Sequence, residues 1–373
     1  MKNKQLIYQV FVRNFSNEGT LEEVTKKLDY IESLGTDVLY LMPIHPIGVE
    51  KRKGTFGSPY AIIDFFGITP DYGSLNDFKT LISETHKRGM KLILDMVFHH
   101  TSPDNPLLKE HPEYYFYKDG KTGNAVGDWS DIIDLETSRP DTQEYLLSVL
   151  RYWVSLGVDG FRFDVASMIA FSFFKKAREA LGPDIIFFAE SIDFDFARYL
   201  KTTEHPSTPD EEMYPTFDYL YNYNYFRVFE KQVREGGHAF ELAELMNDDL
   251  NVTPMRTRVH CLENHDVPRF ARFVKDPKKR LAWMNITSTL YGHMFLYAGQ
   301  ELGSDTDVPL FEKQPVDWNK RDEETFQLYK KKIAEAKAKP AIIDQKVEAL
   351  DENTLRIMTT YEGGEASTIE EKI

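Results

Sequence analysis

Short apolar segments recur along this 373-residue chain, and segments with helical periodicity lie between them. The apolar segments lack the polar–apolar alternation of a strand with one face in water, so they predict strands buried on both faces. Such strands are typical of parallel sheets covered by helices. The predicted strands are Leu6–Val12, Val38–Met42, Leu92–Val97, Gly160–Val165, Ile185–Ala189, Phe217–Leu220, Arg258–Leu262 and Met294–Ala298.

This alternation predicts an α/β chain folded as a (β/α)8 TIM barrel, with a doubly wound open sheet as the alternative. Polar residues gather where several predicted strands end. In a barrel all of those ends open onto one face, which favours the barrel. The polar residues are His45, Asp95 with His100, Asp164, Glu190, His265 with Asp266, and Glu301.

The strand–helix pattern fails between residues 99 and 139, where the chain is polar and aromatic. We expect an inserted subdomain there, after the third strand, with the barrel formed by residues 1–98 and 140–339. Helical periodicity resumes where Asp141 and Glu144 have the spacing of a capping box. Residues 340–373 predict the start of a C-terminal β domain, truncated after a few strands. Its acidic end, Glu362–Ile373, is not expected to continue that domain.

Composition excludes several classes of function. A formal net charge of −15 argues against a nucleic-acid partner, which needs a basic face. No apolar run approaches the roughly 20 residues of a membrane helix, and no secretory signal is visible. The single cysteine, Cys261, lies in an apolar run and predicts a buried packing thiol. We therefore expect a cytoplasmic protein with a neutral ligand.

Three acids, Asp164, Glu190 and Asp266, follow different predicted strands, and a barrel brings them together. Two carboxyl groups that flank a bond are the equipment of glycoside hydrolysis, one as nucleophile and one as acid. Arg162 precedes Asp164 by two residues, so both side chains share a strand face. The arginine would lower the pKa of Asp164, as a nucleophile requires. A structural ion pair or a helix cap is the alternative.

Two histidines and several aromatic residues extend this group. His100 and His265 follow acid-bearing strands and could donate hydrogen bonds to sugar hydroxyls, although packing histidines are common. They lack the HExxH spacing of hydrolytic zinc sites. Tyr60 could stack on a sugar ring or pack in the core, and Trp129 or the Tyr114–Tyr117 cluster could stack in a cleft.

Four motifs together resemble the α-amylase family of glycoside hydrolases, over roughly Leu6 to Lys337. They are DMVFHH (95–100), GFRFD (160–164), FFAES (187–191) and LENHDVPR (262–269). The resemblance implies that Asp164 is the nucleophile, Glu190 the general acid and base, and Asp266 the transition-state stabiliser. It further implies that substrate binds to Tyr60, His100, Arg162, His265 and Arg269.

The family's structural calcium site is where the sequence departs from the resemblance. His99 stands where the family usually has asparagine, and Met168 where it often has histidine. Calcium takes six to eight oxygen ligands. Asp128 and Asp134 alone supply too few of them. We expect calcium to be absent or weakly bound, and no cofactor to be required. Ser167-Met168 also replaces a lysine–histidine pair that contacts the leaving side of the cleft in the family, which disfavours endo-attack on long chains.

The expected activity is retaining cleavage of α-1,4-glucosidic bonds in maltooligosaccharides or related α-glucans. An α-glucosidase or a transglycosylase of the same family is the first alternative, because the sequence does not decide whether water or a sugar resolves the intermediate. A non-catalytic sugar-binding barrel subunit is the second.

Overall fold

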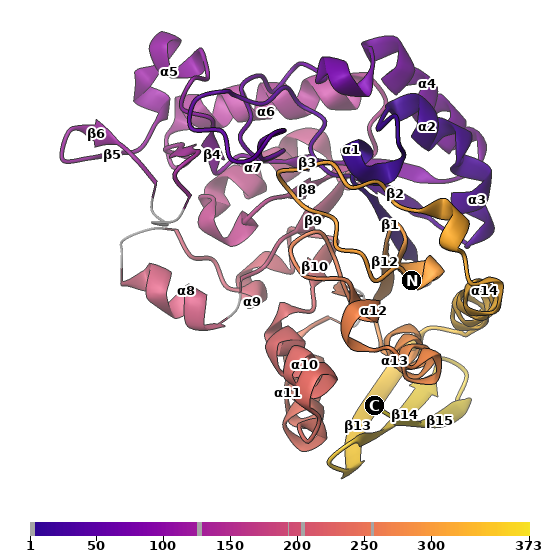
Figure 1. The fold of residues 1–373 in the computed structure, drawn as a ribbon. Helices are drawn as coiled ribbons and strands as arrows, with labels where there is room; N and C mark the ends of the chain where they lie inside the picture. Colours follow the sequence, from indigo (N-terminus) through magenta and orange to yellow (C-terminus); the bar gives the residue numbers. More distant parts are fainter. Residues whose placement is uncertain (1–3, 125–128, 193, 203–205, 255–256) are drawn as a thin grey trace.

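The computed structural model describes the chain except for residues 1–3, 125–128, 193, 203–205 and 255–256 (Figure 1). Within the described residues, eight parallel strands close into a barrel. Neighbouring strands follow one another along the chain, and β1 closes the ring against β12 with Ile7 opposite Phe295. The strands are β1 (Leu6–Val10), β2 (Val38–Leu41), β3 (Lys91–Met96), β8 (Gly160–Phe163), β9 (Ile186–Ala189), β10 (Tyr219–Tyr221), β11 (Arg258–His260) and β12 (His293–Tyr297). The predicted (β/α)8 barrel is confirmed, and the open sheet is excluded.

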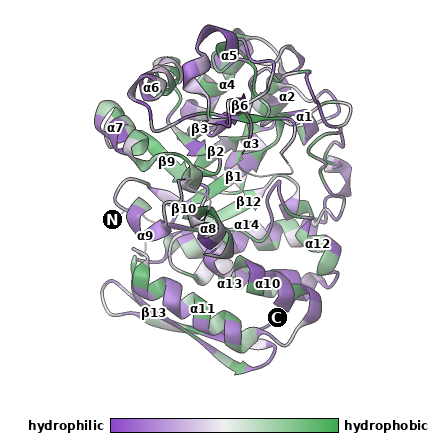
Figure 2. Ribbon diagram, turned by 90° about the vertical axis from the view of Figure 1, so that its left-hand side faces the viewer, coloured by the Kyte–Doolittle hydropathy of each residue, from purple (hydrophilic) through white to green (hydrophobic). Residues whose placement is uncertain are grey.

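Helices lie around the barrel strands (Figure 2). The strands form where the chain is continuously apolar because these helices bury their outer face and side chains fill the inside of the barrel. All four residues of β2, β8 and β9 are buried. Gly160 begins β8 because a Cβ there would lie 2.3 Å from the carbonyl oxygen of Ile186. Cys261, directly after β11, is buried with a free thiol, as the sequence predicts.

Helices follow most of the strands on the outside of the barrel. α4 shows how the sequence sets a helix start: the Ser74 side chain accepts from the backbone of Asp77, and the Asp77 side chain accepts from the backbone of Ser74. None of the helices in the described ranges is long and apolar enough to cross a membrane. The helices are α1 (Val12–Phe15), α2 (Leu21–Lys26), α3 (Leu28–Ser33), α4 (Leu75–Lys87), α6 (Pro140–Ser155), α7 (Phe171–Leu181), α8 (Phe194–Lys201), α9 (Asp210–Met213), α10 (Tyr223–Glu235), α11 (Ala239–Val252), α12 (Phe270–Phe273), α13 (Pro277–Thr289) and α14 (Glu323–Ala338).

The predicted capping box at Asp141 is wrong. Helix α6 begins one residue earlier, at Pro140, whose fixed φ suits the first helical position. Its N-cap, Arg139, makes no side-chain cap. Asp141 instead forms an ion pair with Arg139 at 2.7 Å, and Glu144 pairs with Lys176 at 2.7 Å.

Residues 99–139 contain small elements rather than a barrel unit. They are β4 (His100–Thr101), α5 (Leu107–Glu110), β5 (Tyr117–Lys118), β6 (Lys121–Thr122) and β7 (Ile133–Asp134). β4 pairs with β7, which ties both ends of the segment to the end of β3. The division of the chain into domains at residues 99, 140 and 340 stays a prediction. We call residues 99–139 the insertion.

Residues beyond α14 form an antiparallel sheet at the lower end of the molecule in Figure 1. Its strands are β13 (Ile342–Asp351), β14 (Thr354–Tyr361) and β15 (Ala366–Lys372). The expectation that the acidic end would not continue the β structure is wrong, because β15 pairs with β14 along its length. The acidic residues of β15 are compatible with a strand. Glu370, for example, lies on the solvent-exposed face of the sheet, where its Oε1 is 2.6 Å from Arg356 Nη2 on β14.

Helix α11 holds the edge strand β13 through one side chain. The Asn247 amide donates to the carbonyl oxygen of Val347 at 2.7 Å, and its Oδ1 accepts from the Val347 N–H at 2.9 Å. Val347 is 1% exposed, so water does not reach these backbone groups freely. Asn247 therefore makes the two backbone hydrogen bonds to Val347 that a further strand would make at this edge of the sheet.

We expect Asn247→Ala to lower the free energy of unfolding by about 1–3 kcal/mol, because it leaves a buried N–H and C=O without partners. Urea denaturation followed by circular dichroism measures the change. Asn251→Ala is the matched control, since Asn251 lies one turn further along the same helix and is exposed. Equal stability of the two variants would contradict this role for Asn247.

Candidate active site

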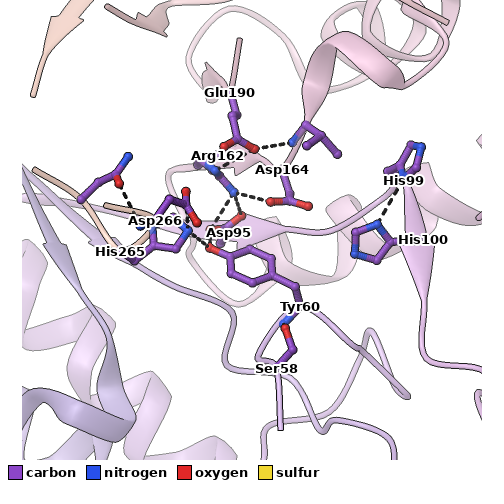
Figure 3. Close-up of polar contacts among 12 residues, drawn as sticks. Ser58, Tyr60, Asp95, His99, His100, Arg162, Asp164, Glu190, His265 and Asp266 are labelled. Carbon is purple, nitrogen blue, oxygen red and sulfur yellow. Dashed lines mark hydrogen bonds and ion pairs between the residues drawn. The ribbon is translucent and has the colours of Figure 1, made fainter. Parts of the chain in front are cut away.

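A cavity of about 440 Å³ opens where the barrel strands end. Asp164, Glu190 and Asp266 line it, and they follow β8, β9 and β11 respectively (Figure 3). Tyr60 and His100 line the same cavity. A larger cavity, of about 590 Å³, lies beside β12, α14 and the C-terminal sheet. Glu335 is the only acid among the described residues that line this larger cavity. The larger cavity therefore lacks the pair of carboxyl groups that glycoside hydrolysis needs.

Arg162 lies beneath the cavity and joins three carboxyl groups. Its Nη1 is 2.8 Å from Asp95 Oδ1 and 2.9 Å from Asp164 Oδ1, and its Nη2 is 2.9 Å from Glu190 Oε2. The Arg162 side chain is fully buried. The strand register produces this arrangement, because Asp95 on β3 and Phe188 on β9 are the lateral neighbours of Arg162 on β8. The sequence predicted the contact with Asp164, whereas Asp95 and Glu190 come from the barrel register.

Burial raises the pKa values of both carboxyl groups beside Arg162. The pKa of Glu190 rises to about 7, because burial outweighs the attraction of Arg162. The pKa of Asp164 rises well above its usual range through burial and repulsion from Glu190, although Arg162 opposes the rise. Arg162 does lower the pKa of Asp164, as the sequence predicted, but burial and Glu190 outweigh this effect, so the expected net lowering is wrong for the free enzyme. The two carboxyl groups form a coupled pair that holds a proton near neutral pH.

Val165 makes a strained turn directly after Asp164. Its φ is 38°, in the left-handed region that β-branched residues avoid. This conformation aims the Val165 N–H at Glu190 Oε2, 2.6 Å away. Strained backbone of this kind persists where surrounding contacts hold it, often at functional sites. The turn fixes Asp164 and Glu190 relative to each other.

A second chain of hydrogen bonds orients Tyr60 and His265. His265 Nε2 is 3.1 Å from Asp266 Oδ2, and an ionised carboxylate only accepts, so Nε2 carries the proton. Its Nδ1 then accepts from the Gln9 amide at 2.9 Å. Nε2 also lies 2.6 Å from the Tyr60 hydroxyl, which donates to Asp95 Oδ2 at 3.0 Å. Burial lowers the pKa of His265, so the ring stays neutral.

The remaining predicted residues take different positions. His100 lines the cavity, and burial lowers its pKa to about 4. Trp129 lines the cavity beside it. The tyrosines at 114, 115 and 117 are not among the lining residues: Tyr114 stacks on His111, Tyr115 is buried and Tyr117 lies on the exposed strand β5.

Arg269 does not reach the cavity, although the resemblance implied that it binds substrate. It is 2% exposed, and its Nη1 forms an ion pair with Glu263. Its Nη2 donates to the carbonyl oxygen of Ala298 at 2.7 Å, which ties the segment after β11 to the end of β12. These contacts make Arg269 a support of the loop that carries Asp266.

Several cavity residues carried no sequence signal. Phe226 on α10 and Phe311 on the loop after β12 line the cavity, but single aromatic residues at such places usually pack in the core. Lys53 and Asp131 form an ion pair at 2.7 Å and also line it. A charge pair between a loop and the insertion cannot be predicted without the fold.

Of the described residues expected around calcium, only Asp134 offers a carboxylate oxygen. His99 and Asp134 face each other, with Nδ1 3.6 Å from Oδ1, so an imidazole nitrogen stands where calcium needs an oxygen. The Met168 side chain is buried and provides only a thioether sulfur. Asp128 lies outside the described residues. The donor set around His99 and Asp134 therefore does not fit calcium.

We expect Asp95→Asn to lower the free energy of unfolding by about 3 kcal/mol, because it removes one carboxylate from a fully buried guanidinium. Urea denaturation measures the loss. Asp71→Asn changes the same chemistry at an exposed position and should leave stability within about 0.5 kcal/mol of the wild type. If the two substitutions have the same effect, Asp95 does not balance the charge of Arg162.

The known proteins that this chain resembles include amylases and glucosidases. A family model described as "Alpha amylase, catalytic domain" matches residues 8–349. The crystal structure of an α-amylase from Lactobacillus plantarum is 35% identical, with a TM-score of 0.91, over 98% of this chain and 87% of that one. An oligo-1,6-glucosidase from Parageobacillus thermoglucosidasius is 25% identical over 92% of this chain and 72% of its own length. An intracellular maltogenic amylase from Bacillus subtilis is 27% identical over 88% of this chain and 56% of its own length. The match to the family model covers most of the barrel and all four motifs, and the chain belongs to the α-amylase family of glycoside hydrolases.

Proposed function

We propose that this enzyme cleaves α-1,4-glucosidic bonds of maltooligosaccharides with retention of anomeric configuration. The observation that carries the proposal is that one buried guanidinium contacts both Asp164 and Glu190 at the wall of the cavity. A shared contact keeps the two carboxyl groups close, as a double displacement requires, whereas an inverting enzyme separates them to admit a water molecule.

In the proposed first step, Glu190 donates its proton to the glycosidic oxygen while an Asp164 carboxylate oxygen attacks the anomeric carbon. The bond from that carbon to the leaving oxygen breaks, and a β-linked glycosyl ester on Asp164 forms. In the second step, Glu190 takes a proton from water, and the resulting hydroxide displaces Asp164. The pKa of about 7 suits Glu190 to both roles near neutral pH.

Asp266, His265 and Tyr60 complete the proposed reacting subsite. Asp266 lines the cavity beside Glu190 and Asp164, so its carboxylate can stabilise the positive charge that develops on the sugar ring. His265 donates to Asp266 and contacts Tyr60, which fixes both groups before substrate arrives. Preorganised groups of this kind contribute because they need no rearrangement during the reaction.

The alternatives differ in what resolves the intermediate. Transfer to a sugar gives longer oligosaccharides, hydrolysis at chain ends gives glucose, and a non-catalytic barrel gives no product. Product analysis with maltotriose and longer maltodextrins separates these outcomes. The presence of all three acids around one cavity supports catalysis over binding alone. The relative named an intracellular maltogenic amylase supports the expectation of a cytoplasmic location.

The proposal predicts that kcat/KM for a maltooligosaccharide falls as pH rises through about 7, because Glu190 must be protonated to act as the acid and its pKa lies there. α-Maltosyl fluoride is the matched control, because fluoride leaves without needing a proton. The kcat/KM for α-maltosyl fluoride should therefore not fall as pH rises through about 7. Rates from pH 5 to 9, with circular dichroism to verify folding, measure both profiles. A kcat/KM for the oligosaccharide that stays constant well above pH 7 would remove Glu190 from the acid role.

Azide rescue tests the two roles separately. Asp164→Ala should lose nearly all turnover, and azide should restore reaction of α-maltosyl fluoride by attack from the face that Asp164 leaves vacant, which gives β-maltosyl azide. Glu190→Ala should lose about 10²- to 10⁴-fold in kcat for a maltooligosaccharide. Azide should then intercept the glycosyl ester on Asp164 and give α-maltosyl azide. The opposite pairing of variants and products, measured by NMR, would exchange the roles, and undiminished turnover in Asp164→Ala would end the proposal.

A further inference from the structure

Three donor side chains meet at the position where the family has calcium, and two of them are imidazoles. His99 Nδ1 is 3.1 Å from His100 Nδ1 and 3.6 Å from Asp134 Oδ1. The ligand atoms of these three residues all lie within 4.8 Å of one another, and each residue is at most 4% exposed. Figure 3 shows the two imidazoles apart from the Arg162 cluster, by which we mean Arg162 with the carboxyl groups of Asp95, Asp164 and Glu190.

This donor set matches a different class of metal ion. Imidazole nitrogen suits zinc and related transition metals, whereas calcium selects oxygen. A tetrahedral zinc site with bonds of about 2.0–2.1 Å places neighbouring ligand atoms about 3.3 Å apart. The separations of 3.1 Å and 3.6 Å from His99 Nδ1 bracket that value.

The backbone already holds the donors in place. His100 on β4 pairs directly with Asp134 on β7, and the N–H of Leu135 donates to the carbonyl oxygen of His99 at 2.8 Å. The His100 ring has a further hydrogen bond with the backbone of Tyr60. Metal-binding histidines commonly have such a second contact, which fixes the ring and its tautomer. Trp129 packs against both rings, with centroids 6.2 Å and 5.8 Å away.

We propose that His99, His100 and Asp134 bind a divalent transition-metal ion of the zinc class, where the family binds calcium. Three protein ligands leave one position of a tetrahedral ion for water or another donor. The ion would join the end of β3 to both strands β4 and β7 of the insertion. It would also fix the ring of His100, which lines the cavity. This site is separate from the reaction proposed for Asp164 and Glu190.

Cobalt and zinc titrations of the full chain test the proposal without reference to activity. The protein is stripped with chelator and desalted, and Co²⁺ is added as the spectroscopic probe. We expect the visible absorption bands of four-coordinate Co²⁺ at one ion per chain, and their loss when Zn²⁺ displaces it. Equilibrium dialysis should give one Zn²⁺ per chain, and Zn²⁺ should raise the melting temperature because it binds only the folded state.

His99→Asn removes one imidazole and should weaken Zn²⁺ binding at least about 10-fold, with loss of the Co²⁺ bands. His111→Asn is the matched control, because His111 lies in the same insertion, about half exposed and next to Glu113. It should bind Zn²⁺ like the wild type. Asp134→Asn is a second test of the same prediction should His99→Asn fail to fold.

Three results would overturn the proposal. They are a wild type that binds neither Co²⁺ nor Zn²⁺, Zn²⁺ binding that survives in both His99→Asn and Asp134→Asn, and a wild-type melting temperature that rises with Ca²⁺ but not with Zn²⁺. Each leaves the roles of Asp164 and Glu190 untouched, because azide rescue tests those separately.

Discussion

One buried guanidinium has to balance more negative charge than it carries. Arg162 contacts Asp95, Asp164 and Glu190, and its side chain is fully buried. Three ionised carboxylates around a single cation would leave uncompensated charge away from water, which is costly. The raised pKa values of Asp164 and Glu190 are the response, since a proton shared by the pair restores the balance. Burial, together with this excess of negative charge, keeps an acid protonated at a pH where an exposed glutamate would be ionised.

The barrel makes this cluster possible because parallel register fixes which residues are lateral neighbours. Asp95 and Arg162 face each other across β3 and β8, and Glu190 follows the next strand. Only the direction of each side chain remains to be set, and local contacts do that. The left-handed turn at Val165 aims an N–H at Glu190, and Tyr40 and Tyr60 both donate to Asp95. A strained residue beside Asp164 is therefore held by the charges that it helps to position.

The sequence predicted the parts of the fold that depend on continuous burial. All eight barrel strands are buried on both faces, and their apolar runs carry that information locally. Predictions failed where the outcome depended on how the folded chain packs. The acidic end forms β15 by pairing with β14 along its length, and buried Arg269 turns from the cavity toward Glu263 and the carbonyl oxygen of Ala298. The pKa of Asp164 was misjudged for the same reason, because adjacent Arg162 is visible in the sequence and the burial that outweighs it is not.

The acids of the candidate active site and most of the cavity wall around them come from different parts of the molecule. The strands and the segments after them supply Asp95, Arg162, Asp164, Glu190 and Asp266, whereas the rest of the cavity wall comes from loops, the insertion and helix α10. Lys53 joins the loop after β2 to Asp131 of the insertion, and its ammonium lies 5.9 Å from the ring centroid of Phe311 on the loop after β12. These contacts shape the cavity without touching the Arg162 cluster. Loops tolerate sequence changes that a packed barrel does not. Relatives with different preferred substrates can therefore retain one reaction centre. We expect their sequences to differ in the cavity wall around Trp129 and Phe311.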